Sequence, residues 1–410
     1  MTKLMAALAA ATLMLTLGCA QATREPAAVT SESRAVSAAD SAALDAMRQR
    51  LARGQAASLL FFSQDERRVA FRNIDALYPT RLVVAGDAPL QLSEAPVDLT
   101  GVTYQVNGET FTLADFLAMP SHMGLIVVKG NRILFEHYAN GNDAASRWIS
   151  FSVTKSVTSM LIGAAIADGY ITSVDEPVAN YLPRLRGTPY EQATIRDVLH
   201  MASGAAWNED YADPNSDVAR AGGANGIELV QYLAQLPKVA APGTTFNYNT
   251  GETNLVGEIL RAAIGNNAST YLTHKIWQPF GMETDATWLL GGPGGGETGG
   301  CCISATLRDY ARIGLFAARD GVLADGTRVL PANWMRDSIT PFSGAPYYGY
   351  LWWLSGDGSY AAQGIFEQQI YIDPAADLVI ATHSNAPTAT GSVYGKHQDA
   401  LTQALRAAVR

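Results

Sequence analysis

Strand and helix patterns are segregated along this sequence of 410 residues, and their order restricts the folds that the chain can adopt. Two apolar runs, at 123–129 and 132–138, flank the dipeptide Gly130-Asn131, which is a strong signal for a β-hairpin. Further strand patterns occur late in the chain, at 347–354, 368–372 and 377–383. Strands at both ends with helices between them predict an α+β fold, in which one antiparallel sheet flanked by helices draws strands from both halves of the chain.

The helical patterns place a mostly helical insert at roughly residues 170–300. Helices are predicted at 152–168, 194–201, 227–236, 251–264 and 397–409, and after a capping-box pattern that begins at Thr306. We expect a ligand site in the cleft between the sheet and the insert.

Charge and residue spacing exclude several classes of protein. The net charge is −9 and no run of five basic residues occurs, which argues against a nucleic-acid partner. The histidines show no HxxxH spacing and the cysteines no CxxC spacing, so we expect no metal and no cofactor. Three cysteines cannot build a disulfide framework, and the adjacent Cys301 and Cys302 are expected to be buried by packing. No protein partner is inferred.

The first residues have the pattern of an export signal. Lys3 precedes an apolar run at 4–17, which is shorter than the ~20 residues that a membrane-spanning helix needs. Cys19 follows Leu17-Gly18, and this triplet resembles the lipobox of bacterial lipoproteins, in which the cysteine is lipidated. A secreted protein cut near Ala20 is the alternative.

These observations predict the organisation of the chain. A signal peptide is expected at 1–18, a tether rich in Ala, Ser and Glu with room for one short helix at 19–57, and one folded domain at 58–410. The protein is therefore expected to be exported, and either periplasmic or attached to a membrane through a lipidated Cys19.

Ser152 and Lys155 stand at the start of a predicted helix. Residues three apart share a face of a helix, so Lys155 can reach the hydroxyl of Ser152. A serine hydroxyl becomes a strong nucleophile when a partly desolvated, neutral lysine takes its proton. Free N–H groups in the first helical turn also suit an oxyanion. The pair predicts nucleophilic catalysis, although a polar helix start would give the same Ser-x-x-Lys pattern.

Two later motifs add to this pair. They are Tyr248-Asn249-Thr250 and Ala362-Gln363-Gly364-Ile365. In this order the three motifs resemble the Ser-x-x-Lys, Tyr-x-Asn and Lys/His-x-Gly elements of the penicillin-recognising serine hydrolases, which include class C β-lactamases and D,D-peptidases. The resemblance extends from about residue 120 to the C-terminus and implies a β-lactamase/penicillin-binding-protein-like fold.

The resemblance also implies the roles of single residues. Ser152 would be the acylated nucleophile, Lys155 the base, and Tyr248 the group that passes the proton to the leaving group. The backbone N–H groups of Ser152 and Ile365 would form the oxyanion hole. Gly364 would belong to the strand that binds the substrate.

The chain departs from the family pattern at two positions. Thr250 stands where the second motif ends in Asn, and Ala362 stands where the third motif has a cation that holds the substrate carboxylate. Within the family, the pattern is most similar to 6-aminohexanoate-oligomer hydrolases and related carboxylesterases. The acidic loop around Tyr211 supports this similarity, with Tyr211 as a substrate-binding residue that assists amide cleavage. An ordinary loop tyrosine covering the core is the alternative.

Taken together, these motifs predict a serine hydrolase that cleaves small-molecule esters or amides through an acyl-enzyme on Ser152. A β-lactamase or D,D-carboxypeptidase that acts on cell-wall-type substrates is one alternative. An inactive surface lipoprotein that only binds its ligand is another.

Overall fold

The structure is a computed structural model, and it describes residues 38–53 and 59–410. Arg34–Arg410 form one compact unit. The predicted signal peptide at 1–18 and Cys19 lie outside the described residues. Within the two described stretches, none of the helices combines the length and hydropathy that a membrane span requires.

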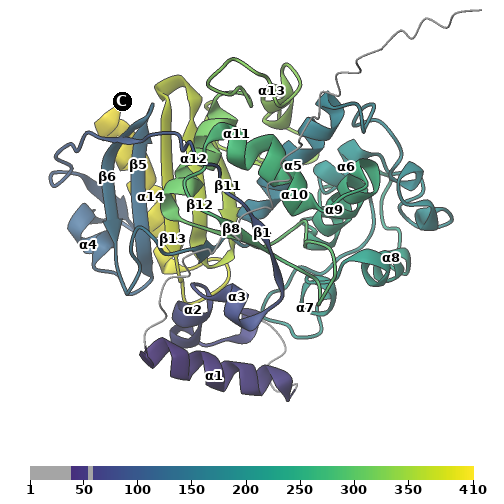
Figure 1. The fold of residues 1–410 in the computed structure, drawn as a ribbon, viewed down its shortest axis with the longest axis horizontal. Coiled ribbons are helices and arrows are strands. Elements are labelled where there is room, and N and C mark those ends of the chain that lie inside the picture. The colour runs from purple at the N-terminus through teal and green to yellow at the C-terminus, as the bar shows by residue number, and fades with distance from the viewer. Residues whose placement is uncertain (1–37, 54–58) are drawn as a thin grey trace, which may run out of the picture. The chain divides into compact units, whose positions relative to one another are not determined.

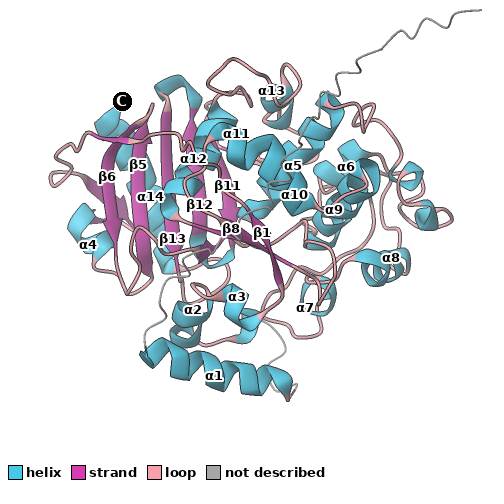
Figure 2. Cartoon of the chain, in the orientation of Figure 1, coloured by secondary structure: helices cyan, strands magenta, loops and turns pink. Residues whose placement is uncertain are grey.

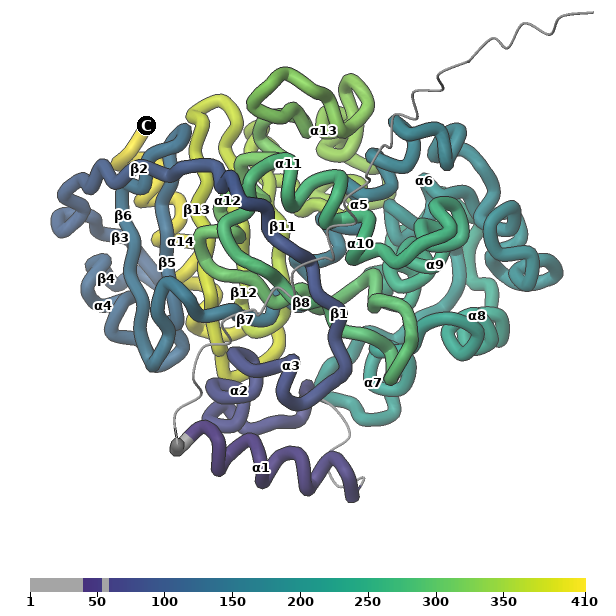
Figure 3. Tube along the Cα trace, viewed as in Figure 1, coloured from purple at the N-terminus to yellow at the C-terminus, as the bar shows by residue number. Residues whose placement is uncertain are grey.

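A seven-stranded sheet is the centre of this unit, and Figure 2 shows its strands gathered together on one side. In spatial order its strands are β10 (Trp353–Leu354), β11 (Tyr360–Gly364), β12 (Gln368–Asp373), β13 (Leu378–Ser384), β5 (His122–Lys129), β6 (Arg132–Tyr138) and β2 (Ser93–Glu94). Neighbouring strands are antiparallel except for the short parallel pair β2 and β6. The early hairpin therefore pairs with the last strand of the chain, as Figure 3 shows by the blue β5 beside the yellow β13.

Both faces of this sheet are buried, because successive side chains of a strand point to opposite sides. In β5, Ile126 and Val128 belong to the core on the face that carries α12 (Leu307–Ala318) and α5 (Val153–Ala167). Leu125 and Val127 belong to the core on the face that carries α14 (Val393–Val409). The sheet thus lies between two helical layers (Figure 1).

The chain between the early and late strands is mostly helical. Its helices are α6 (Ile195–Leu199), α7 (Asp217–Ala221), α8 (Gly226–Ala234), α9 (Thr250–Ile264), α10 (Ala268–Leu272) and α11 (Gln278–Phe280), with short helical turns at Val178–Asn180, Pro183–Leu185 and Thr273–Trp277. The helix α9 packs on α5, and α6 and α8 pack on α9. The helix that carries Ser152 and Lys155 thereby connects the sheet to the helical region.

Smaller elements complete the fold. A four-stranded antiparallel sheet has the order β1 (Thr80–Val83), β8 (Ala286–Leu289), β9 (Ile303–Ala305) and β7 (Trp148–Ile149). The hairpin of β3 (Thr103–Val106) and β4 (Glu109–Thr112) packs with α4 (Leu113–Leu117) against α14. After α12 come α13 (Trp334–Ser338) and the turns that lead into β10. The α+β class predicted from the sequence is confirmed.

The segment before β1 is more ordered than the sequence suggested. The helix α1 (Ala38–Ala52) lies within the predicted tether, yet it packs against α2 (Gln64–Ala70) and α3 (Ile74–Leu77). Its Leu44 and Met47 are buried, and Arg50 forms an ion pair of 2.5 Å with Glu66. The folded unit therefore begins before residue 58, because two apolar side chains one turn apart are enough to dock α1.

The predicted strand at 347–354 is largely wrong. Only β10, its last two residues, pairs as a strand, and the residues before it form turns. Leu351 has a φ of 62°, and a side chain on Gly349 would lie 2.0 Å from the carbonyl oxygen of Ser338. This segment is apolar because it is packed in the core, which produces the same pattern as a strand.

Candidate active site

Ser152 is the N-cap of α5, the helix that follows the short strand β7. Every residue of this helix from Val153 to Ala165 is buried, as expected for a helix packed on all sides. Phe151, which precedes the serine, has a φ of 45°, so the chain turns sharply between strand and helix. Ser152 itself is 9% exposed and lines two cavities.

Lys155 lies one turn further along α5 and is only 1% exposed. Its Nζ donates hydrogen bonds to Thr250 Oγ1 at 3.0 Å and to the carbonyl oxygen of Gly300 at 2.9 Å. Burial lowers the pKa of Lys155 to about 8. A neutral amine has two N–H bonds and one lone pair. Because both N–H bonds have acceptors, the lone pair of the neutral amine remains available to accept a proton.

Glu209 continues this chain of hydrogen bonds. Its carboxylate accepts from the hydroxyl of Thr250 and, at 3.0 Å, from the backbone N–H of the same residue. It also accepts from Trp207 Nε1, and from the hydroxyl of Tyr211 at 2.7 Å. The charge of Glu209 raises the pKa of Lys155 and so opposes the effect of burial. Neither Glu209 nor Thr250 was predicted from the sequence to be a site residue.

The three residues of the second sequence motif, Tyr248-Asn249-Thr250, make different contacts. Asn249 is the N-cap of α9 and accepts from the backbone N–H of Glu252 at 3.0 Å. Thr250 turns toward Lys155 and occupies the place where the family has Asn. The Tyr248 ring centroid lies 5.5 Å from Lys155 Nζ. Burial raises the pKa of Tyr248 above its ordinary value, and a hydrogen bond with Ser152 opposes this rise.

The third motif brings a second backbone segment against the start of α5. A Cβ on Gly364 would lie 2.3 Å from the carbonyl oxygen of Ser150 and 3.1 Å from the backbone nitrogen of Ser152. Glycine therefore lets the end of β11 approach the backbone of Ser152. Ile365 follows and lines both cavities beside Ser152. Ala362, in contrast, is fully buried in the core.

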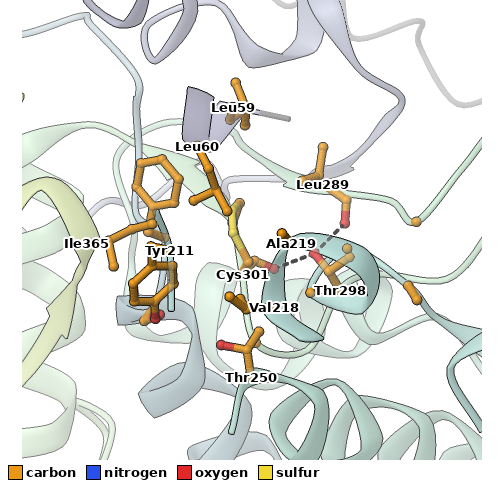
Figure 4. Close-up of a pocket in the computed structure, with 18 of the residues that line it drawn as sticks. Leu59, Leu60, Tyr211, Val218, Ala219, Thr250, Leu289, Thr298, Cys301 and Ile365 are labelled. Atoms are coloured by element: carbon orange, nitrogen blue, oxygen red, sulfur yellow. Dashed lines mark hydrogen bonds between the residues drawn. A yellow bond between two sulfur atoms is a disulfide. The ribbon is translucent and has the colours of Figure 1, made fainter. Parts of the chain in front are cut away.

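Two cavities meet at Ser152 and also share Tyr211 and Ile365. The first, which we call the Leu289 chamber, has a volume of 460 Å³ and is shown in Figure 4. Apolar side chains form much of its wall, among them Leu59, Leu60, Val218, Leu289 and Leu290. Leu59 and Leu60 come from the N-terminal segment, which the sequence analysis did not connect with the site.

The second cavity, which we call the Tyr248 chamber, has a volume of 400 Å³. Besides the shared residues, its wall includes Glu209, Tyr248, Trp353, Gln363, Gly364, Glu367, Gln398 and Asp399. The ring of Trp353 stacks on that of Tyr248, with centroids 5.7 Å apart and planes 20° apart.

Cys301 and Cys302 form part of the wall of the Leu289 chamber, and they are joined by a disulfide (Figure 4). The carbonyl oxygen of Cys301 accepts hydrogen bonds from Thr298 Oγ1 at 2.6 Å and from Trp288 Nε1 at 2.9 Å. These bonds fix the loop that follows Gly300. The carbonyl oxygen of Gly300 in turn accepts a hydrogen bond from Lys155. The expected packing role is thus combined with a covalent link that the sequence analysis did not foresee.

The structure therefore brings together all the residues that the sequence predicted. Ser152, Lys155, Tyr248, Tyr211, Gly364 and Ile365 lie around one junction between two cavities. The hydroxyl of Tyr211, however, donates to Glu209, and burial together with the Glu209 charge raises its pKa well above the ordinary value. In this state Tyr211 points its proton at a carboxylate rather than into the cavity.

Comparisons with known proteins identify the family and the fold of the chain. The chain matches the family model described as Beta-lactamase over residues 114–404. It is 29% identical over 344 residues to the 6-aminohexanoate-dimer hydrolase of Paenarthrobacter ureafaciens, which covers 78% of this chain and 86% of that protein.

Two solved structures show the similarity of fold. The putative 6-aminohexanoate-dimer hydrolase from Bacillus anthracis has a TM-score of 0.75 at 21% identity, over 86% of this chain and 98% of that chain. A family VIII carboxylesterase has a TM-score of 0.52 at 16% identity, over 69% of this chain and 93% of that chain. The match to the family model begins at residue 114, so the N-terminal segment that supplies Leu59 and Leu60 lies outside it.

Proposed function

Because this chain belongs to the beta-lactamase family, as its three ordered motifs predicted, we propose that it is a serine hydrolase that cleaves small esters or amides through an acyl-enzyme on Ser152. The observation that carries the proposal is the position of Lys155. Its amine is buried next to the nucleophile, its pKa is lowered to about 8, and both N–H bonds of the neutral form have acceptors. A lysine held in this way serves as a base near neutral pH.

The reaction has two stages. Lys155 takes the proton of Ser152 while Oγ forms a bond to the carbonyl carbon, and the backbone N–H groups of Ser152 and Ile365 stabilise the negative charge on the carbonyl oxygen. The bond to the leaving group then breaks, its electron pair stays on the leaving atom, and Tyr248 passes the proton from Lys155 to that atom. In the second stage water attacks the acyl carbon, one of its protons passes to Ser152 Oγ through Tyr248 and Lys155, and the bond from Oγ to the acyl carbon breaks, which releases the acid and free Ser152.

Hydrolysis of p-nitrophenyl esters tests the proposal. Ser152→Ala should abolish turnover, and Lys155→Met should reduce it by several powers of ten, since nucleophile and base act as a unit. A fluorophosphonate probe should label the wild type on Ser152, which peptide mass spectrometry would locate. If the Ser152→Ala variant hydrolyses esters at near wild-type rates, the assignment is wrong. If the wild type takes no label but binds muropeptides tightly, the chain is a binding protein.

We further propose that esters and small amides are better substrates than β-lactams; the chain is similar to a 6-aminohexanoate-dimer hydrolase. The support is Ala362, a buried methyl group where β-lactamases and D,D-peptidases carry a cation for the substrate carboxylate. Nitrocefin, a D-Ala-D-Ala peptide, the 6-aminohexanoate dimer and short-chain esters should be compared at equal enzyme concentration. Nitrocefin turnover as fast as ester turnover would contradict this preference.

We also propose that the chain is exported and carries lipid on Cys19. The support is the apolar run at 4–17 followed by Leu17-Gly18-Cys19. Mass spectrometry of the mature N-terminus, from protein produced in a bacterium that processes lipoproteins, would detect the modified cysteine. A mature chain that begins at residue 21 and lacks lipid would instead indicate simple secretion.

A further inference from the structure

The N-terminal segment forms one wall of the Leu289 chamber. The short helical turn Leu59–Phe61 places Leu59 and Leu60 on that wall. Phe61, the third residue of the turn, is 46% exposed and does not line the chamber. Figure 4 shows Leu59 and Leu60 on the side of the chamber opposite Thr250, whose hydroxyl accepts from Lys155. The two leucines therefore face the reacting groups from across the chamber.

This wall is fixed to the rest of the fold through Arg67, a side chain that is only 4% exposed. Its Nη1 donates to the carbonyl oxygen of Phe62, directly after the turn, at 2.7 Å. Its Nη2 donates to the carbonyl oxygens of Ala386 and Pro387 at 2.9 and 3.1 Å. The ring of Phe62 is itself buried. A wall held by buried hydrogen bonds and close packing limits the size of a bound group, whereas a loose wall would adapt to it.

The position of Tyr248 decides which part of the substrate meets this wall. Tyr248 lines the Tyr248 chamber and not the Leu289 chamber. In the proposed reaction it passes a proton to the leaving atom, so that atom must lie within its reach. Ser152 and Ile365 line both chambers, which places the reacting carbonyl group where the chambers meet. The leaving group then extends into the Tyr248 chamber, and the acyl chain extends into the Leu289 chamber.

The size of the Leu289 chamber restricts that acyl chain. Its volume of 460 Å³ lies in the lower half of the range of about 300–1,000 Å³ that is typical of ligand sites. Leu289 and Leu290 line the chamber together with the two leucines of the N-terminal turn, so aliphatic side chains are available to contact methylene groups. A chamber of this kind suits a straight chain of short to medium length.

We propose that Leu59 and Leu60 limit the length of the acyl chain that the enzyme hydrolyses. The segment that carries them lies outside the match to the family model, which begins at residue 114. This inference rests on the proposed function, since it assumes acylation of Ser152. The substrate class is then esters and amides of straight-chain acids of short to medium length. The limit concerns the length of the chain and not the group that ends it, so a 6-aminohexanoyl group belongs to the class.

A series of p-nitrophenyl esters with straight acyl chains, from acetate to decanoate, tests the proposal. We expect kcat/KM of the wild type to rise by about fourfold for each methylene group that the chamber buries. Once the chain reaches the leucine wall, kcat/KM should fall with each further methylene group, because the packed wall cannot make room for it. The chain length with the highest kcat/KM is the quantity to compare between variants.

Variants identify the wall that sets the limit. Leu60→Ala and Leu59→Ala should move the optimum to chains about two carbons longer, because the surrounding structure fills the vacated space only partly. Leu60→Phe should move it to shorter chains. Phe61→Ala is the matched control, because it truncates a large side chain of the same turn outside the chamber and should leave the optimum unchanged. Ratios between esters within one preparation do not depend on the fraction of active enzyme.

A second pair of substrates tests which chamber holds which part. These are the butanoates of p-nitrophenol and of the larger 4-methylumbelliferone. Leu60→Ala should change their kcat/KM values by the same factor, since the acyl group is shared. If Leu60→Ala alters the choice between the two leaving groups and not the acyl optimum, the chambers have the opposite roles and the inference is overturned. An optimum that neither leucine variant moves, or that Phe61→Ala moves equally, overturns it as well.

Failure of the inference can be distinguished from failure of the proposed function. Unchanged chain-length profiles in enzymes that Ser152→Ala inactivates would refute the role of the leucines and leave the hydrolase intact. Absence of hydrolysis for every ester of the series, or hydrolysis that survives Ser152→Ala, would overturn both.

Discussion

The rings of Phe151 and Phe366 pack against each other with their centroids 5.4 Å apart, and both residues have a positive φ, 45° and 59°. Phe151 precedes Ser152, and Phe366 follows Ile365. The two backbone N–H groups proposed to bind the oxyanion are thus each next to a residue in a backbone conformation that bulky side chains rarely adopt. Such conformations persist only where the surrounding packing enforces them.

Phe71 supplies that packing from the N-terminal segment. Its ring is fully buried and lies 4.9 Å from the ring of Phe151 and 5.4 Å from that of Phe366. We predict that Phe71→Ala destabilises the protein by about 3–5 kcal/mol and also lowers the ester kcat/KM of the folded enzyme. Urea unfolding and ester kinetics below the transition measure the two effects. Phe116→Ala, a buried ring in the core beside α14, should cost similar stability but spare kcat/KM.

The pH dependence of activity should report Lys155. Only the neutral amine can accept the proton of Ser152, and the pKa of Lys155 is lowered to about 8. The kcat/KM for a neutral ester should therefore rise with pH, by about tenfold per unit well below 8, and level off above it. A profile that is flat or falls over this range would show that Lys155 is not the base.

Glu209→Gln should shift this profile toward lower pH. The negative charge of Glu209 favours the protonated form of Lys155, so removing it lowers the pKa of the amine further. The midpoint of the kcat/KM profile, measured for both enzymes under the same ionic conditions, checks the direction. If Glu209 acts only in folding, Glu209→Gln would lower the fraction of active enzyme and leave the midpoint of the kcat/KM profile unchanged.

Thr250 can be tested by a graded pair of substitutions. Thr250→Ser keeps the hydroxyl that accepts from Lys155 and donates to Glu209, so activity should remain within a few fold of the wild type. Thr250→Ala leaves a buried N–H bond of Lys155 without an acceptor, and kcat should fall by about 10- to 100-fold, which corresponds to the 1–3 kcal/mol cost of an unsatisfied group. Equal loss in both variants would point to packing of the methyl group instead.

Tyr211→Phe should distinguish amide from ester cleavage. An amide nitrogen must be protonated to leave, whereas an activated phenolate leaves unaided, so an extra hydroxyl donor matters for amides. Since the Tyr211 hydroxyl donates to Glu209 in the free protein, it must turn toward the substrate to act. We expect amide kcat to fall by about tenfold or more and p-nitrophenyl ester turnover to change little. A parallel loss for both substrates would make Tyr211 a support for Glu209.

The sequence by itself determined the α+β class, the helices around the site and the residues of its three motifs. These features are local or periodic: a hairpin turn at Gly130-Asn131, the capping pattern at Thr306, and a Ser and Lys one turn apart. The helix predicted at 152–168 is observed as Val153–Ala167 because its boundaries depend on residues close in sequence.

Tertiary structure alone decided what surrounds Lys155 and Ser152. Glu209 and Gly300 lie far from Lys155 in sequence, and no local pattern links them to it. The same holds for Phe71, Leu59 and Leu60, which build the site from the segment before the motifs. Their positions follow from the packing of distant elements onto α5, and the pKa of Lys155 follows from the burial which that packing produces.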